Sequence, residues 1–168
     1  PIAVGEVLRR LVSRAVCVEL KARFAQLLLP VGQVGVGVAS GAEAAVFAVR
    51  EKLRRSLDPD NTVALKVDIV NAFNCTSRDA ILSLTQRFLP KMYPWVSFCY
   101  ETPAYLFCEG SVLTFRSAQG VQQGDPLGPF LFALSLRRCM EGVRAAAPDC
   151  LAVWYLDDGT LVGPASEI

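Results

Sequence analysis

The sequence predicts an α+β fold in which helices back a small antiparallel sheet. Apolar residues recur at helical spacing between Val7 and Leu28, which indicates a long amphipathic helix. Alternating apolar residues over 62–69 indicate a strand, and two apolar runs on either side of Asp157 and Asp158 indicate a hairpin. With 168 residues, 52% of them hydrophobic, the chain is long enough to bury a sizeable core.

The first helix is expected to end by Pro30. After it, the alternation of Val and Gly over 31–38 predicts a short strand, with glycines that let another backbone or a ligand approach closely. Ser40 and Glu43 have the spacing of a capping box, which predicts the start of a second helix that continues through Leu53. Proline, asparagine and aspartate over 58–61 then predict a turn.

The second half of the chain carries similar signals. A loop with three glycines or prolines precedes an apolar run, and such a loop can present backbone N–H groups to phosphate or sugar, or can be a plain connection. In order we expect a helix capped at 76–79 and stopped by Pro90, a helical segment over 91–102, a hairpin of 105–108 with 112–115, this glycine-punctuated loop over 117–126, a buried helix from about Pro126, and a linker over 142–149.

Three carboxylates stand at the ends of expected strands. Asp68 ends the strand that begins at Thr62, while Asp157 and Asp158 stand between the two runs of the last hairpin. Asp-Asp-Gly is typical of a tight turn because Asp and Gly tolerate turn dihedrals, so a solvated turn is the favoured explanation when it is taken alone. Two strands that each carry acids at one end can place the three carboxylates around a single point. Because the carboxylates repel one another there, the arrangement favours a bound divalent cation.

Composition argues against several other kinds of site. The chain has no histidine, and its six cysteines show no CxxC spacing, so we expect reduced thiols in an intracellular protein and no zinc site. No apolar run reaches the ~18 residues of a membrane span, and no signal peptide is visible, so no membrane partner is expected. Residues 1–60 contain nine Lys and Arg against six Asp and Glu, and residues 61–168 contain eight against ten. This uneven charge distribution supports a bound polyanion only weakly.

Three stretches occur in a telling order. Asp68 is followed four and five residues on by Ala72-Phe73, then comes the loop Gln119–Leu127, and last Tyr155–Asp158. Together they resemble motifs A, B and C of the reverse transcriptase palm, in the form found in non-LTR (LINE-like) retrotransposons and partly shared with group II intron and retron enzymes. Because the motifs occur together in the family's order, the resemblance is specific, and it covers essentially the whole chain.

Two upstream stretches extend the resemblance. Pro1–Val4 is similar to the tail of the family's Arg-Pro-Ile fingers motif, and Gln33–Val36 is similar to its Gln-x-Gly-Phe stretch. The chain departs from the family's pattern at Asn71 and Asn74, where Asp is common, and at Gly128, where Ser is common. Contacts of the family through positions 71 and 74 are therefore not carried over.

The resemblance implies a polymerase palm with an antiparallel sheet, in which residues 1–60 are part of the fingers and 61–168 are the palm, truncated before the thumb. It implies an RNA-directed DNA polymerase that adds deoxyribonucleotides from dNTPs to a DNA primer on an RNA template. Two Mg²⁺ ions, with Mn²⁺ as an alternative, would be held by Asp68 and Asp157, and Asp158 would be the adjacent carboxylate with a looser contact.

The resemblance also assigns the residues around the nucleotide. The backbone N–H groups of Ala72 and Phe73 would meet the triphosphate, and the Phe73 ring would be a steric gate against a 2′-hydroxyl. Gln119 would contact the nucleotide sugar or base. The remaining expected contacts are with template and primer, and they involve Gln33, Gly120 and Tyr155.

Two alternatives stay open at this point. Because an Arg before Pro1, the later palm motifs and the thumb are not in the sequence, the chain is expected to be part of a longer polyprotein with endonuclease segments, and in isolation a catalytically incomplete fragment that at most binds nucleic acid. An RNA-dependent RNA polymerase is disfavoured, because Phe73 should exclude ribonucleotides and such enzymes usually carry Gly-Asp-Asp. A core-packing role for Phe73 also remains open.

Overall fold

A computed structural model describes residues 5–107, 115–122 and 124–168. Its contacts divide the chain into two compact units. We call them the sheet unit, residues 20–70 and 136–168, and the loop unit, the described residues of 5–19 and 71–135. Helices α1 (Val7–Leu28) and α6 (Gly128–Ala146) each contribute to both units. The units are described separately, and the expected division into fingers and palm at residue 60 stays a prediction.

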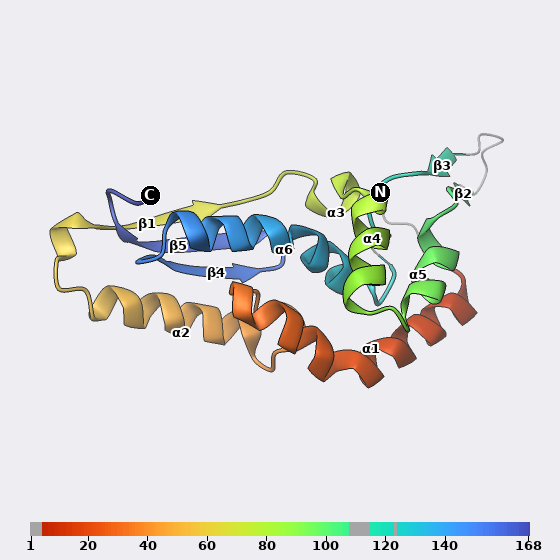
Figure 1. Cartoon of the computed structure of the whole chain (residues 1–168), viewed down its shortest axis with the longest axis horizontal. Helices are drawn as coiled ribbons and strands as arrows, with labels where there is room; N and C mark the ends of the chain where they lie inside the picture. Colours follow the sequence, from red (N-terminus) through yellow and green to blue (C-terminus); the bar gives the residue numbers. More distant parts are fainter. Residues whose placement is uncertain (1–4, 108–114, 123) are drawn as a thin grey trace. The chain divides into compact units, whose positions relative to one another are not determined.

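The sheet unit is built on three antiparallel strands in the order β1-β5-β4 (Figure 1). These are β1 (Thr62–Val67), β4 (Leu151–Tyr155) and β5 (Asp158–Pro164). Helix α2 (Gly41–Arg54) packs on β4 and β5. The antiparallel sheet backed by helices is therefore confirmed.

The core of the sheet unit lies against the second half of α6. Trp154 and Leu161 of the sheet are buried there with Met140 of the helix. Gly159 is the register partner of Trp154, and a Cβ at this glycine would lie 2.4 Å from Cζ3 of the indole. A side chain at position 159 is excluded because the Trp154 ring already occupies that space.

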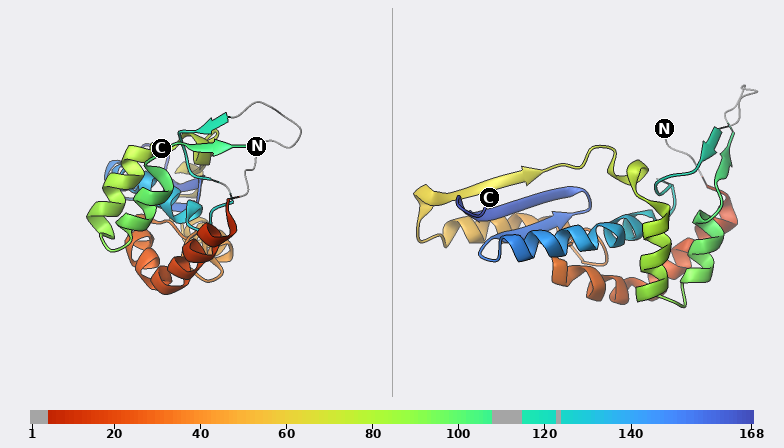
Figure 2. Two further views of the ribbon diagram at one scale, coloured as in Figure 1. Left: turned by 90° about the vertical axis from the view of Figure 1, so that its right-hand side faces the viewer. Right: turned by 45° about the horizontal axis from the view of Figure 1, so that its top comes forward.

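The loop unit is mostly helical. It contains α3 (Ala72–Cys75), α4 (Arg78–Phe88) and α5 (Tyr93–Tyr100), with α4 and α5 side by side (Figure 2). Strands β2 (Ala104–Leu106) and β3 (Phe115–Ser117) pair antiparallel, which confirms the expected hairpin where it is described. The expected turn of this hairpin and the fingers motif at 1–4 lie outside the described residues.

The expected strand over 31–38 is wrong. A short 3-10 helix, η1 (Leu29–Val31), is followed by bends, with an isolated bridge between Gln33 and Trp154. Gly32 and Gly37 have φ values of 86° and 77°, which are left-handed and not extended. The glycines serve local folding, because left-handed backbone costs glycine least.

Two boundaries also differ from expectation. Ser40 precedes α2 but has a φ of 51° and no side-chain cap, so the expected capping box is wrong although the helix is confirmed. The expected linker over 142–149 is shorter, because α6 continues to Ala146. By contrast, Ser77 caps α4 as predicted, accepting a hydrogen bond from the Ala80 N–H. Among the described residues, no helix is both long and apolar enough to cross a membrane.

Candidate functional site

The three acids of interest lie at one end of the sheet. Asp68 directly follows Val67, whose register partner on β5 is Gly159. Asp158 directly precedes Gly159 and pairs with Tyr155, and Asp157 belongs to the two-residue turn that joins β4 to β5. Strand register therefore brings together the strand ends that carry Asp68, Asp157 and Asp158, as their positions at the ends of the expected strands predict.

The acids are open to solvent. Asp68 and Asp158 are exposed, and Asp157 is partly exposed. Lys66 lies on β1 with its Nζ 3.8 Å from Oδ1 of Asp158, and both side chains are more than half exposed. Such a pair contributes little to stability, so it holds Asp158 only loosely.

The donor set is the one that magnesium prefers, because all three residues offer carboxylate oxygens at an accessible end of the sheet. Over 5–107, 115–122 and 124–168, however, the side chains do not form a group of three or more acids, cysteines or histidines placed to hold a metal. The residues thus fit the ion in chemical type and in strand position. Metal binding itself stays a prediction.

The turn before Asp158 differs from the expected one. We predicted Asp-Asp-Gly as the turn, but Leu156 and Asp157 form it, and both Asp158 and Gly159 belong to β5. The left-handed residue is Leu156, with a φ of 56°. A branched side chain rarely adopts this conformation without support from its surroundings.

Gln33 supplies support for that turn. Its side chain is fully buried in the sheet unit, and it exchanges hydrogen bonds with the backbone of Leu156. We expected Gln33 to contact the template, but in this structure its amide has partners within the chain and no exposed surface. Tyr155, also expected near template or primer, lines a groove between α2 and the sheet together with Asp158 and Thr160.

In the loop unit, the residues expected around the nucleotide are neighbours. The Gly120 N–H donates to the carbonyl of Thr76, and the Val121 N–H donates to the carbonyl of Phe73, at 2.9 and 2.8 Å. Gln119 is exposed, and its Nε2 donates to the Cys75 carbonyl at 3.0 Å. The loop that follows β3 is thus fastened to the short helix α3 and the residue that follows it.

Phe73 combines a packing contact with exposed surface. Its ring stacks on that of Phe132, with centroids 4.5 Å apart and an interplanar angle of 22°. Phe132 is 1% exposed, whereas Phe73 is partly exposed. Ala72 beside it is buried. The ring is therefore held from one side by the core while part of it remains available to a ligand.

Gly120 is tightly enclosed by the protein itself. It has a φ of 71°, and a Cβ there would lie 2.5 Å from the carbonyl oxygens of both Phe73 and Asn74. We expected this glycine to let the template–primer approach, and the structure shows that the chain's own backbone makes a close approach. The glycine is required for folding of the loop, whatever it also does for a ligand.

We expect Gly120→Ala to lower the free energy of unfolding by at least about 2 kcal/mol, because the alanine would be strained at positive φ and would collide with two carbonyls. Gly142→Ala is the matched control, since a Cβ at Gly142 meets nothing within 4 Å and helix propensity alone should stabilise α6 by about 0.5–1 kcal/mol. Urea unfolding of both variants checks this, and equal effects would contradict it.

Arg78 anchors the same loop, a role that was not predicted from the sequence. Its guanidinium donates to the carbonyls of Ser117 and Gly120 at 2.7 and 3.1 Å, and to the Ser117 hydroxyl at 2.8 Å. Arg78 is buried, and burial lowers the pKa of its guanidinium. One signal was available: a cation in the first turn of a helix opposes the helix dipole, so it needs another reason to be there.

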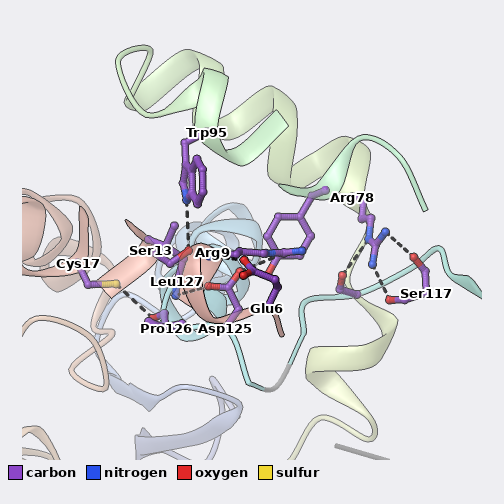
Figure 3. A network of polar contacts seen from close by, with 12 residues as sticks. Glu6, Arg9, Ser13, Cys17, Arg78, Trp95, Ser117, Asp125, Pro126 and Leu127 are labelled. Carbon is purple, nitrogen blue, oxygen red and sulfur yellow. Dashed lines mark hydrogen bonds and ion pairs between the residues drawn. The ribbon is translucent and has the colours of Figure 1, made fainter. Parts of the chain in front are cut away.

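Asp125 holds the far end of the same loop through a network of hydrogen bonds (Figure 3). Its buried carboxylate accepts hydrogen bonds from Arg9 Nη2 at 3.2 Å, from the Tyr100 hydroxyl at 2.7 Å and from the Leu127 N–H at 3.0 Å. Burial, and then the neighbouring Asp125, raise the pKa of Tyr100 well above its ordinary value. The phenol therefore keeps its proton and remains a donor at neutral pH.

Comparison with known proteins gives one family and a consistent fold. A family model described as reverse transcriptase (RNA-dependent DNA polymerase) matches residues 8–167. The retrotransposable element SLACS 132 kDa protein of Trypanosoma brucei gambiense is 30% identical over 122 residues, which are 70% of this chain and 10% of that protein. The chain thus spans about a tenth of this relative's length.

Two solved structures share the fold. Telomerase from Candida albicans, in complex with a TWJ fragment of telomeric RNA, is similar over 96% of this chain and 31% of its own, with a TM-score of 0.65 and 15% identity. Apo telomerase from Candida tropicalis, truncated from its C-terminal domain, is similar over 90% of this chain and 33% of its own, with a TM-score of 0.59 and 14% identity. At these identities the likeness concerns the fold alone.

Proposed function

We propose, since this chain belongs to the reverse transcriptase family, that it supplies the catalytic acids of an RNA-directed DNA polymerase. The observation that carries the proposal is the strand register, which brings Asp68, Asp157 and Asp158 to one end of the sheet in a chain matched by the family model over 8–167. Its substrates would be a dNTP, a DNA primer and an RNA template.

Asp68 and Asp157 would hold the metal ions through their carboxylate oxygens, with Asp158 in a looser contact. Two Mg²⁺ ions, or Mn²⁺ in their place, would lower the pKa of the primer hydroxyl and stabilise the leaving pyrophosphate. Asn at Asp68 or Asp157 would keep the size of the side chain and lose the negative charge that offsets the cation. The shared chemistry of these acids predicts that both substitutions act alike.

In the loop unit, Phe73 and Gln119 would select the nucleotide. Phe73 is the candidate steric gate because its ring is held by Phe132 and yet partly exposed. Gln119, hydrogen bonded to the backbone just after Phe73, would contact the sugar or base. The exposed surfaces of these two side chains belong to segments that the backbone hydrogen bonds of Gly120 and Val121 join.

We expect Phe73→Val to admit ribonucleotides, since a smaller side chain leaves room for the 2′-hydroxyl. The ratio of kcat/KM for ribonucleotides to that for deoxyribonucleotides should rise by about tenfold or more, the rate equivalent of about 1.4 kcal/mol. Phe107→Val is the control, because Phe107 is 83% exposed. Primer extension with each nucleotide class measures the ratio, and a rise shared by both variants would refute the gate.

The activity itself is tested by primer extension on an RNA template, using the intact protein that carries this segment. Incorporation of deoxyribonucleotides that depends on Mg²⁺ and on Asp157 would support the proposal. Extension that persists without divalent cations would contradict it. The second candidate function is a catalytically incomplete segment, and it is favoured because the match covers only 10% of the SLACS relative. The same assay on residues 1–168 alone tests this candidate.

A further inference from the structure

We infer that Gln33 is a positioning residue for Asp157, and that it acts by holding the turn residue Leu156 in its left-handed conformation. The inference rests on the proposed function for its catalytic consequence. Its structural part stands on the contacts of the sheet unit alone. It gives Gln33 a task different from the template contact that the family resemblance implies.

Both ends of the Gln33 amide are engaged. Oε1 accepts from the N–H of Leu156 at 2.8 Å and from the N–H of Gly35 at 2.9 Å, and Nε2 donates to the Leu156 carbonyl at 3.0 Å. The side chain is 0% exposed, so water does not compete for these bonds. Gln33 thus binds the N–H and the carbonyl of a single turn residue, as a clamp would.

The backbone on either side keeps this clamp in register. The Val34 N–H donates to the Trp154 carbonyl, and the Trp154 N–H donates to the Gly32 carbonyl, both at 2.8 Å. These bonds form the isolated parallel bridge between Gln33 and Trp154. Gln33 is thereby fixed beside Trp154, the residue before the last of β4 and two residues before Leu156.

Leu156 is a residue that needs such support. At a φ of 56° the Cβ of a leucine lies close to a carbonyl oxygen, which makes this conformation unfavourable. Glycine has no Cβ and adopts it readily. The φ and ψ angles of Leu156 determine the direction in which the next residue leaves the strand. Because Asp157 is that residue, the clamp on Leu156 determines where the Asp157 carboxylate lies.

The glycine of the Gln-x-Gly stretch, Gly35, leaves room for the clamp. A Cβ at Gly35 would lie 2.8 Å from the Leu156 nitrogen and 2.9 Å from Oε1 of Gln33. Both atoms belong to the clamp, so an alanine here would enter the hydrogen bond between them. The glutamine supplies the hydrogen bonds, and the glycine two residues on leaves the room for them.

Gln33→Met tests the clamp, because methionine has a similar length and neither accepts nor donates as the amide does. We expect the Leu156 amide proton to exchange at least tenfold faster in this variant, since its acceptor is lost. Gln26→Met is the matched control, because Gln26 is exposed on α1, and its exchange profile should be unchanged. Hydrogen exchange read by NMR requires no catalytic activity.

The catalytic consequence is tested by kinetics and a second substitution. In Gln33→Met, kcat for primer extension should fall by about tenfold or more while the KM for dNTP stays within about twofold, because only the position of an acid changes. Adding Leu156→Gly should restore most of kcat, since glycine adopts positive φ without the clamp. A residue that merely supports folding would not be rescued in this way.

Each outcome decides a separate point. Unchanged exchange at Leu156 in Gln33→Met would overturn the clamp, and so would a fall in kcat that Leu156→Gly leaves uncorrected. If Gln33→Met does not fold, Gly35→Ala takes its place, with the same expected exchange at Leu156 and the same overturning result. If exchange at Leu156 is fast in Gln33→Met but the intact unsubstituted protein has no polymerase activity, the clamp is sustained and the proposed function is refuted.

Discussion

Asp157→Asn is expected to lower the rate of primer extension by on the order of 10³-fold or more. The substitution removes the charge that would balance a metal ion, and a loss of about 4 kcal/mol of transition-state stabilisation corresponds to this factor. Asp157 precedes the first pair of β5, at the end of the sheet that also carries Asp68. Asp68→Asn should therefore produce an effect of similar size.

A matched control separates this effect from a general loss of negative charge. Asp60 is an exposed acid of η2 (Pro59–Asn61), ahead of β1, and Asp60→Asn should leave the rate of extension unchanged. Asp158→Asn should have a smaller effect than Asp157→Asn, because its contact with metal is expected to be looser. Single-turnover extension with an RNA template measures all four variants, and full activity of Asp157→Asn would refute the metal assignment.

The largest effect on stability is expected from Asp125→Ala. The alanine would leave the guanidinium of Arg9 and the hydroxyl of Tyr100 without their common acceptor, and breaking a buried ion pair from one side costs about 3–5 kcal/mol. Nε of Arg9 is buried and has no hydrogen-bond partner among the described residues, so the ion pair that Nη2 makes with Asp125 is needed to offset the desolvation of the guanidinium. A typical domain has only about 5–15 kcal/mol in total.

Urea unfolding measures this cost. Asp79→Ala is the control in the same unit, because Asp79 is exposed in the first turn of α4 and should cost less than about 1 kcal/mol through the helix dipole. Asp125→Asn should cost less than Asp125→Ala, since an amide oxygen can still accept from Tyr100. Equal costs for Asp125→Ala and Asp79→Ala would show that the buried network contributes nothing to stability.

Much of the fold could be predicted from local patterns. The period of the apolar residues predicted α1, alternation predicted β1, and the two apolar runs around Asp157 and Asp158 predicted the last hairpin. Helix and strand each impose a fixed period on the direction of their side chains, so the pattern predicts the element even where apolar side chains such as Val63 and Leu65 of β1 are exposed. That the three acids lie at one end of the sheet could be predicted for a related reason, because each acid stands at a strand end and antiparallel register is regular.

The remainder depends on contacts far apart in the chain. Gly32 and Gly37 are left-handed, the carbonyls of Ala152 and Lys21 leave no room for a Cβ at these positions, and no pattern over 31–38 reveals those neighbours. Leu156, which the Gln33 amide binds, is 123 residues away, and the partners of Arg78 are about 40 residues away. Such roles follow from tertiary packing, so sequence periodicity does not indicate them.

The proposed function depends above all on the binding of divalent metal by Asp68 and Asp157 at one end of the sheet. The most direct measurement is a titration of isotope-labelled protein with Mn²⁺, which broadens NMR signals close to the ion, followed by competition with Mg²⁺. We predict that broadening centres on residues 67–69 and 156–159, is reversed by Mg²⁺ and is lost in Asp157→Asn. Broadening that centres elsewhere, or that persists in Asp157→Asn, would contradict the account.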